Sequence, residues 1–477
     1  MEKDTSQRMN ATISESINLF DSISPIDFRY YGRDEKIKSK LWPYLSEEAV
    51  IKYIAKVESV LTNTFAELGI CTHEIAQEIE NASKKVTAAE AYLEEDRIKH
   101  PIRAVVNCIR SKVSKEGKPY VHFTATSQDI WATAIAARYR DLTNNVLIPK
   151  LLELEKTLIN LAMREKETVQ MGRTHGQFAE PITFGFAIAH YVSRLGSRIS
   201  GIRDAGNNLR GKVAGAVGAY NSLSLFLDDP VEFEAQVLSK LDLKASPISS
   251  QIVEAEFVTD YVHSILSAFG VLANIADDMR HLQRSEIAEV QEFFAEEQVG
   301  SSTMPQKRNP VRFEYIKSMW KAMMPSIITV YSDQISEHQR DLTNLESARF
   351  IGEILAVFYV CVSLLNELMS VLTVNRANLK KNFDLSKDRA LGEPAYLLLC
   401  AHGHPNAHES VSRLASESQK TGKTLYELLL QDKTLESCFK KFDQKQSSIL
   451  KNPENYIGIA GRKVEDVCRY WEKELGL

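Results

Sequence analysis

The chain has 477 residues, of which 25% are charged, and a formal net charge of -5 at pH 7. A chain of this length can bury several hydrophobic cores, so two or three subdomains are expected. The near balance of charge argues against a nucleic-acid-binding protein, which usually carries a concentrated basic face.

Six cysteines are scattered along the chain, and no two of them form a C-x-x-C pair. We therefore expect no disulfides, and a reducing cytoplasm is the simplest compartment. The N-terminal residues are polar and lack the apolar core of a signal peptide. Residues 1–20 are expected to form a loose or weakly helical tail.

The first part of the chain predicts helices separated by polar breaks. A turn-rich segment at 24–32 carries Arg29 and Tyr30. Apolar residues at helical spacing then predict helices at 47–68, 73–93, 102–113 and 130–142. Pro101 interrupts this pattern, because proline disfavours helix at the residue before it.

The hydroxyl-rich segment 120–129 is a second break in the helical pattern. Thr126 or Ser127 is a suitable cap for the helix that follows it. A broad apolar stripe over 146–161 predicts another buried helix, which the segment 172–177 is expected to end.

A helix over 183–209 is expected next, and a glycine-rich segment at 211–220 follows it. This segment superficially resembles a phosphate loop. However, no Lys-Ser/Thr pair follows its last glycine, and no strand precedes it. Close backbone packing is therefore the expected role of these glycines.

The second half of the chain predicts further long helices, at 249–282, 310–331 and 350–373. The most apolar stretch, 351–374, contains charged residues, and its longest charge-free run is shorter than the ~18–20 residues of a membrane span. We predict a buried helix at the centre of a bundle. Strand patterns are nearly absent, so the expected fold is all-α, a central bundle of long helices flanked by two smaller helical domains. The expected domains are 1–123, 124–374 and 375–477.

The polar loop at 295–311 lies between two of these long helices. Lys307 and Arg308 are suited to bind an anion, and the hydroxyls of Ser301 and Ser302 are suited to move protons. We predict that the loop closes over an anionic substrate.

Asn309 and Pro310, at the end of this loop, predict the N-cap and the first position of the next helix. The positive end of that helix would favour a carboxylate or a phosphate.

Three polar breaks, at 120–129, 172–181 and 299–310, each carry histidine, hydroxyl or cationic residues. In a bundle of antiparallel helices, breaks after successive helices alternate between the two ends. Symmetric packing of bundles from different subunits would bring the breaks together. The pattern therefore favours a homo-oligomer with composite sites.

His175 lies between two glycines, Gly172 and Gly176, rather than on an apolar helix face, which favours a role in proton transfer. His122 and His100 are weaker candidates. His402, His404 and His408 resemble a metal cluster by number, but no carboxylate or cysteine stands at ligand spacing, so no metal site is expected.

Several motifs together resemble those of a known family. The sequence from Gly300 to Pro310 is similar to the G-S-S-x-M-P-x-K-x-N-P signature of the fumarase/aspartase superfamily. The segment 126–129 matches its T-S-x-D region, and 172–177 matches G-R-T-H-G-Q. Within the superfamily the chain most resembles the adenylosuccinate lyase family, from about residue 22 to the C-terminus. The supporting segments are 24–30, 122–123, 283–286, 339–343 and 452–458.

The resemblance implies a homotetramer with active sites built from three subunits, and no cofactor. It implies elimination of fumarate from adenylosuccinate to give AMP, and from SAICAR to give AICAR, in purine nucleotide biosynthesis. Ser301 would be the base and His175 the acid, with no nucleic-acid or membrane partner. The residues that would bind substrate are Arg29, Tyr30, Lys99, His100, Thr126, Ser127, Gln251, Ser302, Lys307, Arg308, Asn309, Arg340 and Arg349. His122 and Glu314 would support the site, and Glu314 is a candidate orienting partner of His175.

Four positions depart from the family pattern, namely Pro101, Ala255, Tyr315 and Leu345. All four belong to recognition of the substrate, whereas the proton-transfer residues are intact. Two alternatives therefore stay open. One is a sister lyase that releases fumarate from argininosuccinate or from a non-nucleotide N-succinyl amine, and the other is a catalytically silent structural homologue.

Overall fold

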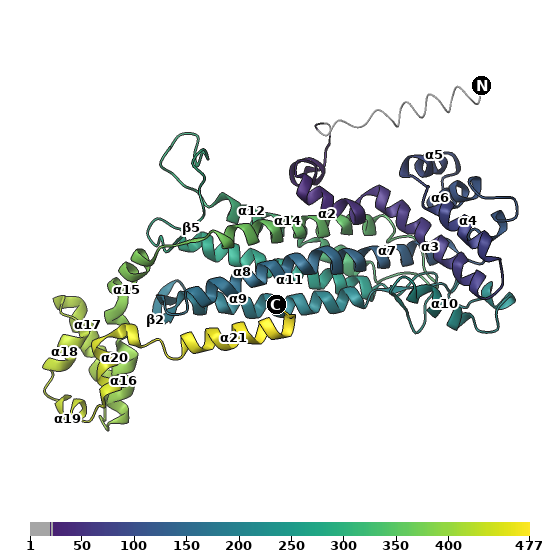
Figure 1. Cartoon of the computed structure of the whole chain (residues 1–477). Helices are drawn as coiled ribbons and strands as arrows, with labels where there is room; N and C mark the ends of the chain where they lie inside the picture. Colours follow the sequence, from purple (N-terminus) through teal and green to yellow (C-terminus); the bar gives the residue numbers. More distant parts are fainter. Residues whose placement is uncertain (1–19, 21) are drawn as a thin grey trace. The chain divides into compact units, whose positions relative to one another are not determined.

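The computed structural model describes residue 20 and residues 22–477, and most of these residues are helical (Figure 1). The predicted tail over residues 1–20 lies outside the described residues except for Phe20. The expectation of an all-α fold is confirmed, because the strands in the described part are short and pair only as two-stranded ribbons.

The N-terminal helices begin where the sequence supplies a cap. The Ser46 hydroxyl accepts a hydrogen bond from the Ala49 N–H at 3.1 Å, and Thr87 forms a capping box with Glu90. The predicted helix 73–93 is therefore wrong in extent, because Thr87 starts a second helix. The elements of this part are η2 (Ile26–Gly32, a π-helical turn), α2 (Glu35–Leu45), α3 (Glu47–Glu67), α4 (His73–Ser83), α5 (Ala88–Ile98), α6 (Pro101–Ser111), η3 (Lys118–Tyr120), α7 (Ser127–Leu142) and η4 (Thr143–Leu147).

Longer helices follow, and most of their positions agree with the apolar periodicity, although α11 begins at Glu256 and not at residue 249 as predicted. They are α8 (Ile148–Arg164), α9 (Phe184–Asn207), α11 (Glu256–Leu282), α12 (Val311–Met323) and α14 (Ile351–Ser370). The predicted helix 310–331 is interrupted, because Pro325 caps a separate short helix, α13 (Ser326–Ser332). The short elements between them are η5 (Leu223–Leu225), α10 (Pro230–Ser239) and η6 (Ser347–Phe350).

An antiparallel hairpin follows α8, where the sequence predicted only the end of a helix. Its strands are β1 (Val169–Thr174) and β2 (Gln177–Thr183), with a register shift between Met171 and Arg173. The turn is possible because His175 and Gly176 both have positive φ, at 54° and 74°. The remaining ribbons are parallel β3 (Arg210–Gly211) with β4 (Lys244–Ala245), and antiparallel β5 (Val290–Gln291) with β6 (Thr373–Val374).

The chain forms two compact units. Unit 1 contains the described residues up to Leu151, together with Arg198–Gly270 and Met319–Ser363. Unit 2 contains Leu152–Ser197, Val271–Ser318 and Leu364–Leu477. The predicted three domains, and the flanking of a central bundle by two smaller ones, stay predictions.

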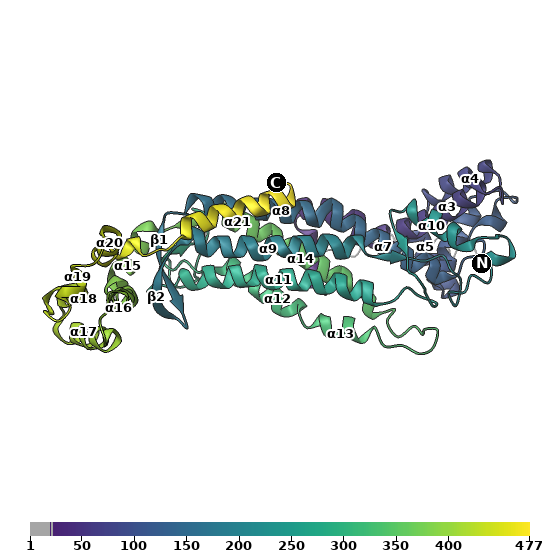
Figure 2. The same ribbon diagram turned by 90° about the horizontal axis from the view of Figure 1, so that it is seen from below.

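Packed helices form the core of each unit. In unit 1, Phe269 of α11 meets Phe358 of α14 with ring centroids 5.7 Å apart. In unit 2, α9 and α11 lie side by side in both views (Figures 1 and 2), and Arg194 donates to the Asn274 side chain at 2.6 Å. Both cores are of the helix-on-helix kind that the apolar stripes indicated.

The apolar helix near residue 360 is mostly buried. The helical stretch Ser347–Ser370 is long and apolar enough to cross a membrane by length and composition, but 61% of its most apolar window is buried. Its buried face supports the prediction of a core helix. The C-terminal elements are α15 (Arg376–Ala390), α16 (Gly392–Ala401), α17 (Ala407–Thr421), α18 (Leu425–Gln431), α19 (Glu436–Phe439), α20 (Gln444–Lys451), η7 (Pro453–Asn455) and α21 (Ala460–Leu475).

Candidate active site

The predicted site residues divide between the two units. The predicted substrate-binding residues that belong to unit 1 are Arg29, Tyr30, Lys99, His100, Thr126, Ser127, Gln251, Arg340 and Arg349. Those expected to transfer protons or bind the fumarate half belong to unit 2, namely His175, Ser301, Ser302, Lys307, Arg308 and Asn309. Each unit therefore carries a different part of the expected chemistry.

Ser301 lies in the loop between β5 and α12. Its hydroxyl is half-buried and accepts hydrogen bonds from the backbone N–H groups of Met304 at 3.1 Å and Thr303 at 3.4 Å. A hydrogen bond to an anionic oxygen is stronger than one to a neutral oxygen. The two N–H groups therefore favour the alkoxide form of Ser301. Ser302 is exposed beside it.

Gly300 and Asn309 hold the two ends of this loop together. A Cβ atom on Gly300 would lie 2.1 Å from the Lys307 carbonyl oxygen, so no larger residue fits there. The Asn309 amide donates to the Gly300 carbonyl at 3.0 Å. These two contacts hold the ends of the loop next to each other.

The predicted capping of α12 by Asn309 and Pro310 is wrong. The helix begins at Val311, and the Glu292 carboxylate accepts from the N–H groups of its second and third residues, at 3.2 and 3.4 Å. Burial raises the pKa of Glu292, although these N–H donors oppose that effect. A protein carboxylate thus already occupies the positive end of α12.

The two cations of the loop, Lys307 and Arg308, differ in their contacts. The Arg308 guanidinium lies over the Phe294 ring, 5.2 Å from its centroid. Lys307 is exposed. Lys307 is therefore the better placed of the two to meet an incoming carboxylate.

His175 lies at the tip of the β1–β2 hairpin. It is exposed and has a left-handed backbone conformation, with φ at 54°. No hydrogen bond joins it to Glu314 in the part of the chain that the structure describes, so the orienting role of Glu314 stays a prediction. Glu314 is itself exposed on α12.

An ion pair anchors the hairpin that carries His175. Glu289 is 0% exposed and accepts two hydrogen bonds from the Arg173 guanidinium, at 2.6 and 3.1 Å. The side-chain amides of Gln170 and Asn382 donate to the same carboxylate, each at 2.9 Å. Arg173 of the G-R-T-H-G-Q motif therefore fixes the hairpin, which the sequence alone did not reveal.

Unit 1 brings His100 close to Ser127, with the imidazole Nε2 and the hydroxyl 3.4 Å apart. His100 is the N-cap of α6, and its Nδ1 accepts from the Arg103 N–H at 3.2 Å. Pro101 occupies the first position of the helix, where its missing N–H is tolerated. Lys99 precedes the pair and is exposed, with φ at 57°.

His122 forms an ion pair with a fully buried carboxylate. Its Nδ1 lies 2.6 Å from a Glu58 oxygen, and Glu58 is 0% exposed. Burial lowers the pKa of His122, but the charge of Glu58 and the hydrogen bond together raise it above its usual value. The Glu58 carboxylate therefore favours the protonated form of His122, which lies just before the 124–127 segment in the chain.

Two further predicted residues are joined through the backbone. The Gln251 N–H donates to the Gln339 carbonyl at 3.1 Å, next to Arg340. The Arg340 guanidinium donates to the Asp333 carbonyl at 2.7 Å.

Arg349 and Arg29 are, like Lys99, exposed cations of unit 1 among the predicted residues. Arg349 lies over the Trp131 ring, 5.6 Å from its centroid. Arg29 and the half-buried Tyr30 belong to the π-helical turn η2. In residues 20 and 22–477, no three His, Cys, Asp or Glu side chains lie close enough together to hold a metal ion.

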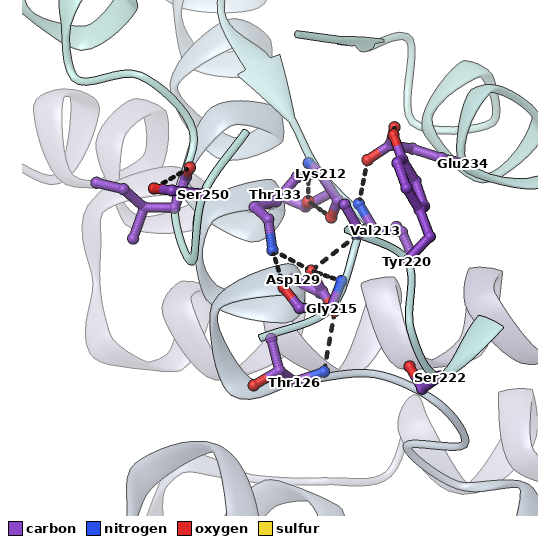
Figure 3. A network of polar contacts seen from close by, with 12 residues as sticks. Thr126, Asp129, Thr133, Lys212, Val213, Gly215, Tyr220, Ser222, Glu234 and Ser250 are labelled. Carbon is purple, nitrogen blue, oxygen red and sulfur yellow. Dashed lines mark hydrogen bonds and ion pairs between the residues drawn. The ribbon is translucent and has the colours of Figure 1, made fainter. Parts of the chain in front are cut away.

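A buried polar network underlies the start of α7 (Figure 3). Asp129 and Lys212 are each 1% exposed and form an ion pair, although they are 83 residues apart in the chain. The Asp129 carboxylate also accepts from the Thr126 N–H at 2.9 Å. Thr126 is the N-cap of α7, as the sequence allowed, and Asp129 three residues later completes a capping box with it.

Comparison with known proteins agrees with these observations. Residues 11–324 match the family described as Lyase, and residues 336–457 match the one described as Adenylosuccinate lyase C-terminal. An adenylosuccinate lyase from Archaeoglobus fulgidus is 33% identical over 95% of this chain and 99% of its own length. An N-acetyl-S-(2-succino)cysteine lyase from Enterococcus italicus is 29% identical over 90% of this chain and 93% of its own length.

A solved structure of a fumarate lyase from Mesorhizobium sp. BNC1 has the same fold, with a TM-score of 0.79 and 22% identity over 91% of this chain and 98% of the other. The all-α fold and the loop around Ser301 define a fumarate-releasing lyase of the fumarase/aspartase superfamily. Within that superfamily, the chain belongs to the adenylosuccinate lyase family.

Proposed function

We propose that this chain eliminates fumarate from adenylosuccinate to give AMP, and from SAICAR to give AICAR, in purine nucleotide biosynthesis. The proposal rests on the environment of Ser301, whose hydroxyl accepts hydrogen bonds from two backbone N–H groups. These bonds occur in a chain that belongs to the adenylosuccinate lyase family. The six cysteines are free thiols, which supports a reducing cytoplasm as the compartment.

In the proposed reaction Ser301 takes a proton from the succinyl Cβ. The C–N bond then breaks, its electron pair stays with nitrogen, and His175 protonates that nitrogen. Negative charge grows on the succinyl carboxylate oxygens while the carbanion forms, and Lys307 is a donor suited to meet it. Closure of the loop excludes water, which strengthens each of these contacts.

We further propose a homotetramer whose active sites are shared by three subunits. His175 is exposed at a hairpin tip, and acid catalysis of this kind needs a site from which water is excluded. Apolar side chains on and beside α13 are also exposed, among them Met324, Ile328 and Ile335. An exposed apolar face supports contact with another subunit, and light scattering of the purified protein tests for the mass of a tetramer.

The main test follows fumarate release by ultraviolet absorbance with purified protein. The panel contains adenylosuccinate, SAICAR, argininosuccinate and an S-succinylated cysteine. We expect turnover of the first two. If only another compound of the panel is turned over, the proposed substrate is wrong and that compound takes its place. If none is turned over, the result favours the catalytically silent homologue.

The assigned base is tested by Ser301→Ala. We expect kcat to fall by about 10³-fold or more, because base and loop act as a unit. Gln306→Ala is the matched control, since Gln306 is an exposed residue of the same loop with no assigned role. An unchanged kcat in Ser301→Ala would remove Ser301 from the mechanism.

A sister lyase acting on a non-nucleotide succinyl compound is the second candidate. Ala255 and Leu345, two of the departures from the family pattern, line a cavity of about 110 Å³ in unit 1. Trp131 and Phe257 belong to the same wall, which makes the cavity mainly apolar. Such a lining favours an uncharged group on the leaving half, and the same substrate panel decides between the two candidates.

A further inference from the structure

The chain between α13 and α14 forms a loop that carries two of the predicted substrate residues, Arg340 and Arg349 (Figure 2). The backbone of this loop takes unusual conformations near Arg340, because His338 and Arg340 have φ values of 34° and 106°. Residues with a side chain rarely adopt a positive φ, so contacts with the rest of the structure must hold the loop in this form.

Asp333, the first residue after α13, fixes this loop at two points. Its carboxylate accepts hydrogen bonds from the Ser347 hydroxyl, at 2.8 Å to one oxygen and 2.9 Å to the other. Its backbone carbonyl accepts a hydrogen bond from the Arg340 guanidinium at 2.7 Å. Arg340 and Ser347 are 7 and 14 residues away along the chain, so one residue holds both the middle and the far end of the loop.

The surroundings of Asp333 strengthen its bonds to Ser347. Asp333 lines the cavity of about 110 Å³ whose walls include Trp131 and Phe257. Burial raises the pKa of the Asp333 carboxyl group, while the Ser347 hydrogen bond and the charge of Arg340 oppose this effect. Beside apolar walls, a hydrogen bond to a charged oxygen is stronger than the same bond in water.

The bonds to Ser347 also determine where Arg349 lies, two residues further along the chain. Ser347 begins the turn η6, and its hydroxyl donates to the Asn344 carbonyl as well, at 3.0 Å. Arg349 belongs to the same turn, and its guanidinium lies over the Trp131 ring of α7. A displacement of Ser347 therefore moves η6 and the Arg349 side chain with it.

The backbone on either side of Arg340 is held by further hydrogen bonds. The Arg340 N–H donates to the Glu337 carbonyl at 2.7 Å, and the Gln339 carbonyl accepts from the Gln251 N–H at 3.1 Å. The Arg340 Nε is buried and has no hydrogen-bond partner in residues 20 and 22–477. A buried cationic donor without a partner costs free energy. The contacts of the loop therefore stabilise an arrangement that Arg340 would not adopt by itself.

We propose that Asp333 is a positioning residue, which holds Arg340 and Arg349 at the geometry that binds the substrate. The inference rests on the proposed function. Asp333 acts through the two arginines and does not touch the substrate. Loss of its carboxylate lets the loop relax toward ordinary φ values, so that the substrate binds more weakly while bound substrate still reacts.

The main test removes the contact between Asp333 and Ser347 from either side. Asp333→Ala and Ser347→Ala should each raise KM for adenylosuccinate about tenfold, with kcat within about twofold of the unmodified protein. The double variant should have the KM of Asp333→Ala, because both substitutions break the same bonds. An additive rise of KM in the double variant, or a kcat that falls as far as KM rises, would overturn the inference. Ser347→Ala is the milder change and gives the answer if Asp333→Ala does not fold.

A conservative variant and a matched control accompany these substitutions. The amide oxygen of Asp333→Asn still accepts a hydrogen bond from Ser347, so KM should stay within about twofold of the unmodified protein. A KM for Asp333→Asn equal to that of Asp333→Ala would show that this bond does not position the arginines. Ser332→Ala is the control, because its exposed hydroxyl donates to the Ile328 carbonyl within α13, at 2.8 Å. It should leave KM and kcat unchanged.

Hydrogen exchange separates failure of this inference from failure of the proposed function, because it needs no substrate. In Asp333→Ala the backbone N–H groups of residues 334–346 should exchange about tenfold faster, while those of α14 keep their rates. Unchanged exchange in residues 334–346 overturns the inference. If the unmodified protein does not turn over adenylosuccinate, the proposed function is wrong, and KM is compared for the panel substrate that is turned over. An equal KM in Asp333→Ala and the unmodified protein for that substrate also overturns the inference.

Discussion

Glu155 of α8 carries a proton at neutral pH. The residue is 0% exposed, and neither carboxylate oxygen has a hydrogen-bond partner in the described part of the chain. Burial raises the pKa of its carboxyl group to about 9. In the unfolded chain the same group has an ordinary pKa of roughly 4.3.

The folded protein and the unfolded chain bind different numbers of protons at this carboxyl group, so the free energy of unfolding depends on pH. Between these two pKa values the folded protein keeps a proton that the unfolded chain has lost, so the free energy of unfolding falls as pH rises. The slope is about 1.4 kcal/mol per pH unit, which amounts to roughly 3–4 kcal/mol between pH 4.3 and 7. Stability associated with Glu155 is thus fully present below the unfolded pKa and is lost progressively toward pH 9.

Glu155→Gln removes the titration while keeping the shape of the side chain. We expect the variant to match the unmodified protein near pH 4.5 and to be more stable by an increasing margin up to pH 8.5. Urea unfolding at a series of pH values measures the difference. Glu153→Gln, an exposed position of the same helix, is the control and should show no such trend.

The reasoning would be refuted by a difference between Glu155→Gln and the unmodified protein that is constant from pH 5 to 8.5. A constant difference would mean that the carboxyl group is ionised in the folded state or is reached by water. Glu155→Met provides a second reading, because it also removes the buried polar atoms and should be stabilising at neutral pH.

Two other substitutions test contacts within unit 2. In Gly196→Ala the added Cβ would lie 2.4 Å from the Trp471 ring, so α21 should shift, with a loss of about 1–3 kcal/mol in the free energy of unfolding and a change in tryptophan fluorescence. A smaller residue at 471 should restore the stability of that variant. Arg173→Met leaves the buried Glu289 carboxylate without its cation, and urea unfolding should show a loss of roughly 3–5 kcal/mol. An unchanged unfolding midpoint would show that the ion pair does not anchor the hairpin.

Much of the fold was predictable, because long apolar stripes at helical spacing are buried only when the helices that carry them pack against one another. The helices α3, α9 and α14 begin and end within a few residues of their predicted positions. The predicted helix 73–93 is too long because Thr87 supplies a capping box that the periodicity does not reveal. The β1–β2 hairpin was missed because its turn depends on backbone conformations of two consecutive residues.

The site was predictable only where its signals are local. The polar and cationic residues of the loop around Ser301 predict a site, and in the structure two backbone N–H groups donate to the Ser301 hydroxyl. Asp129 and Lys212 are 83 residues apart, so only the tertiary fold reveals their ion pair. Likewise, Glu292 replaces Asn309 at the start of α12 because the competing carboxylate comes from another segment.

The apolar composition of α14 also bears on how the chain folds during synthesis. A helix with the hydropathy of a membrane span is a target for aggregation or for the wrong insertion machinery while it is unpaired. Its packing partners on α8 and α11, such as Phe269, come earlier in the chain and are therefore synthesised before it. At a synthesis rate of roughly 5–20 residues per second, the earlier helices have several seconds to assemble before α14 appears. The order of the helices along the chain thus shortens the time for which the most apolar one remains uncovered.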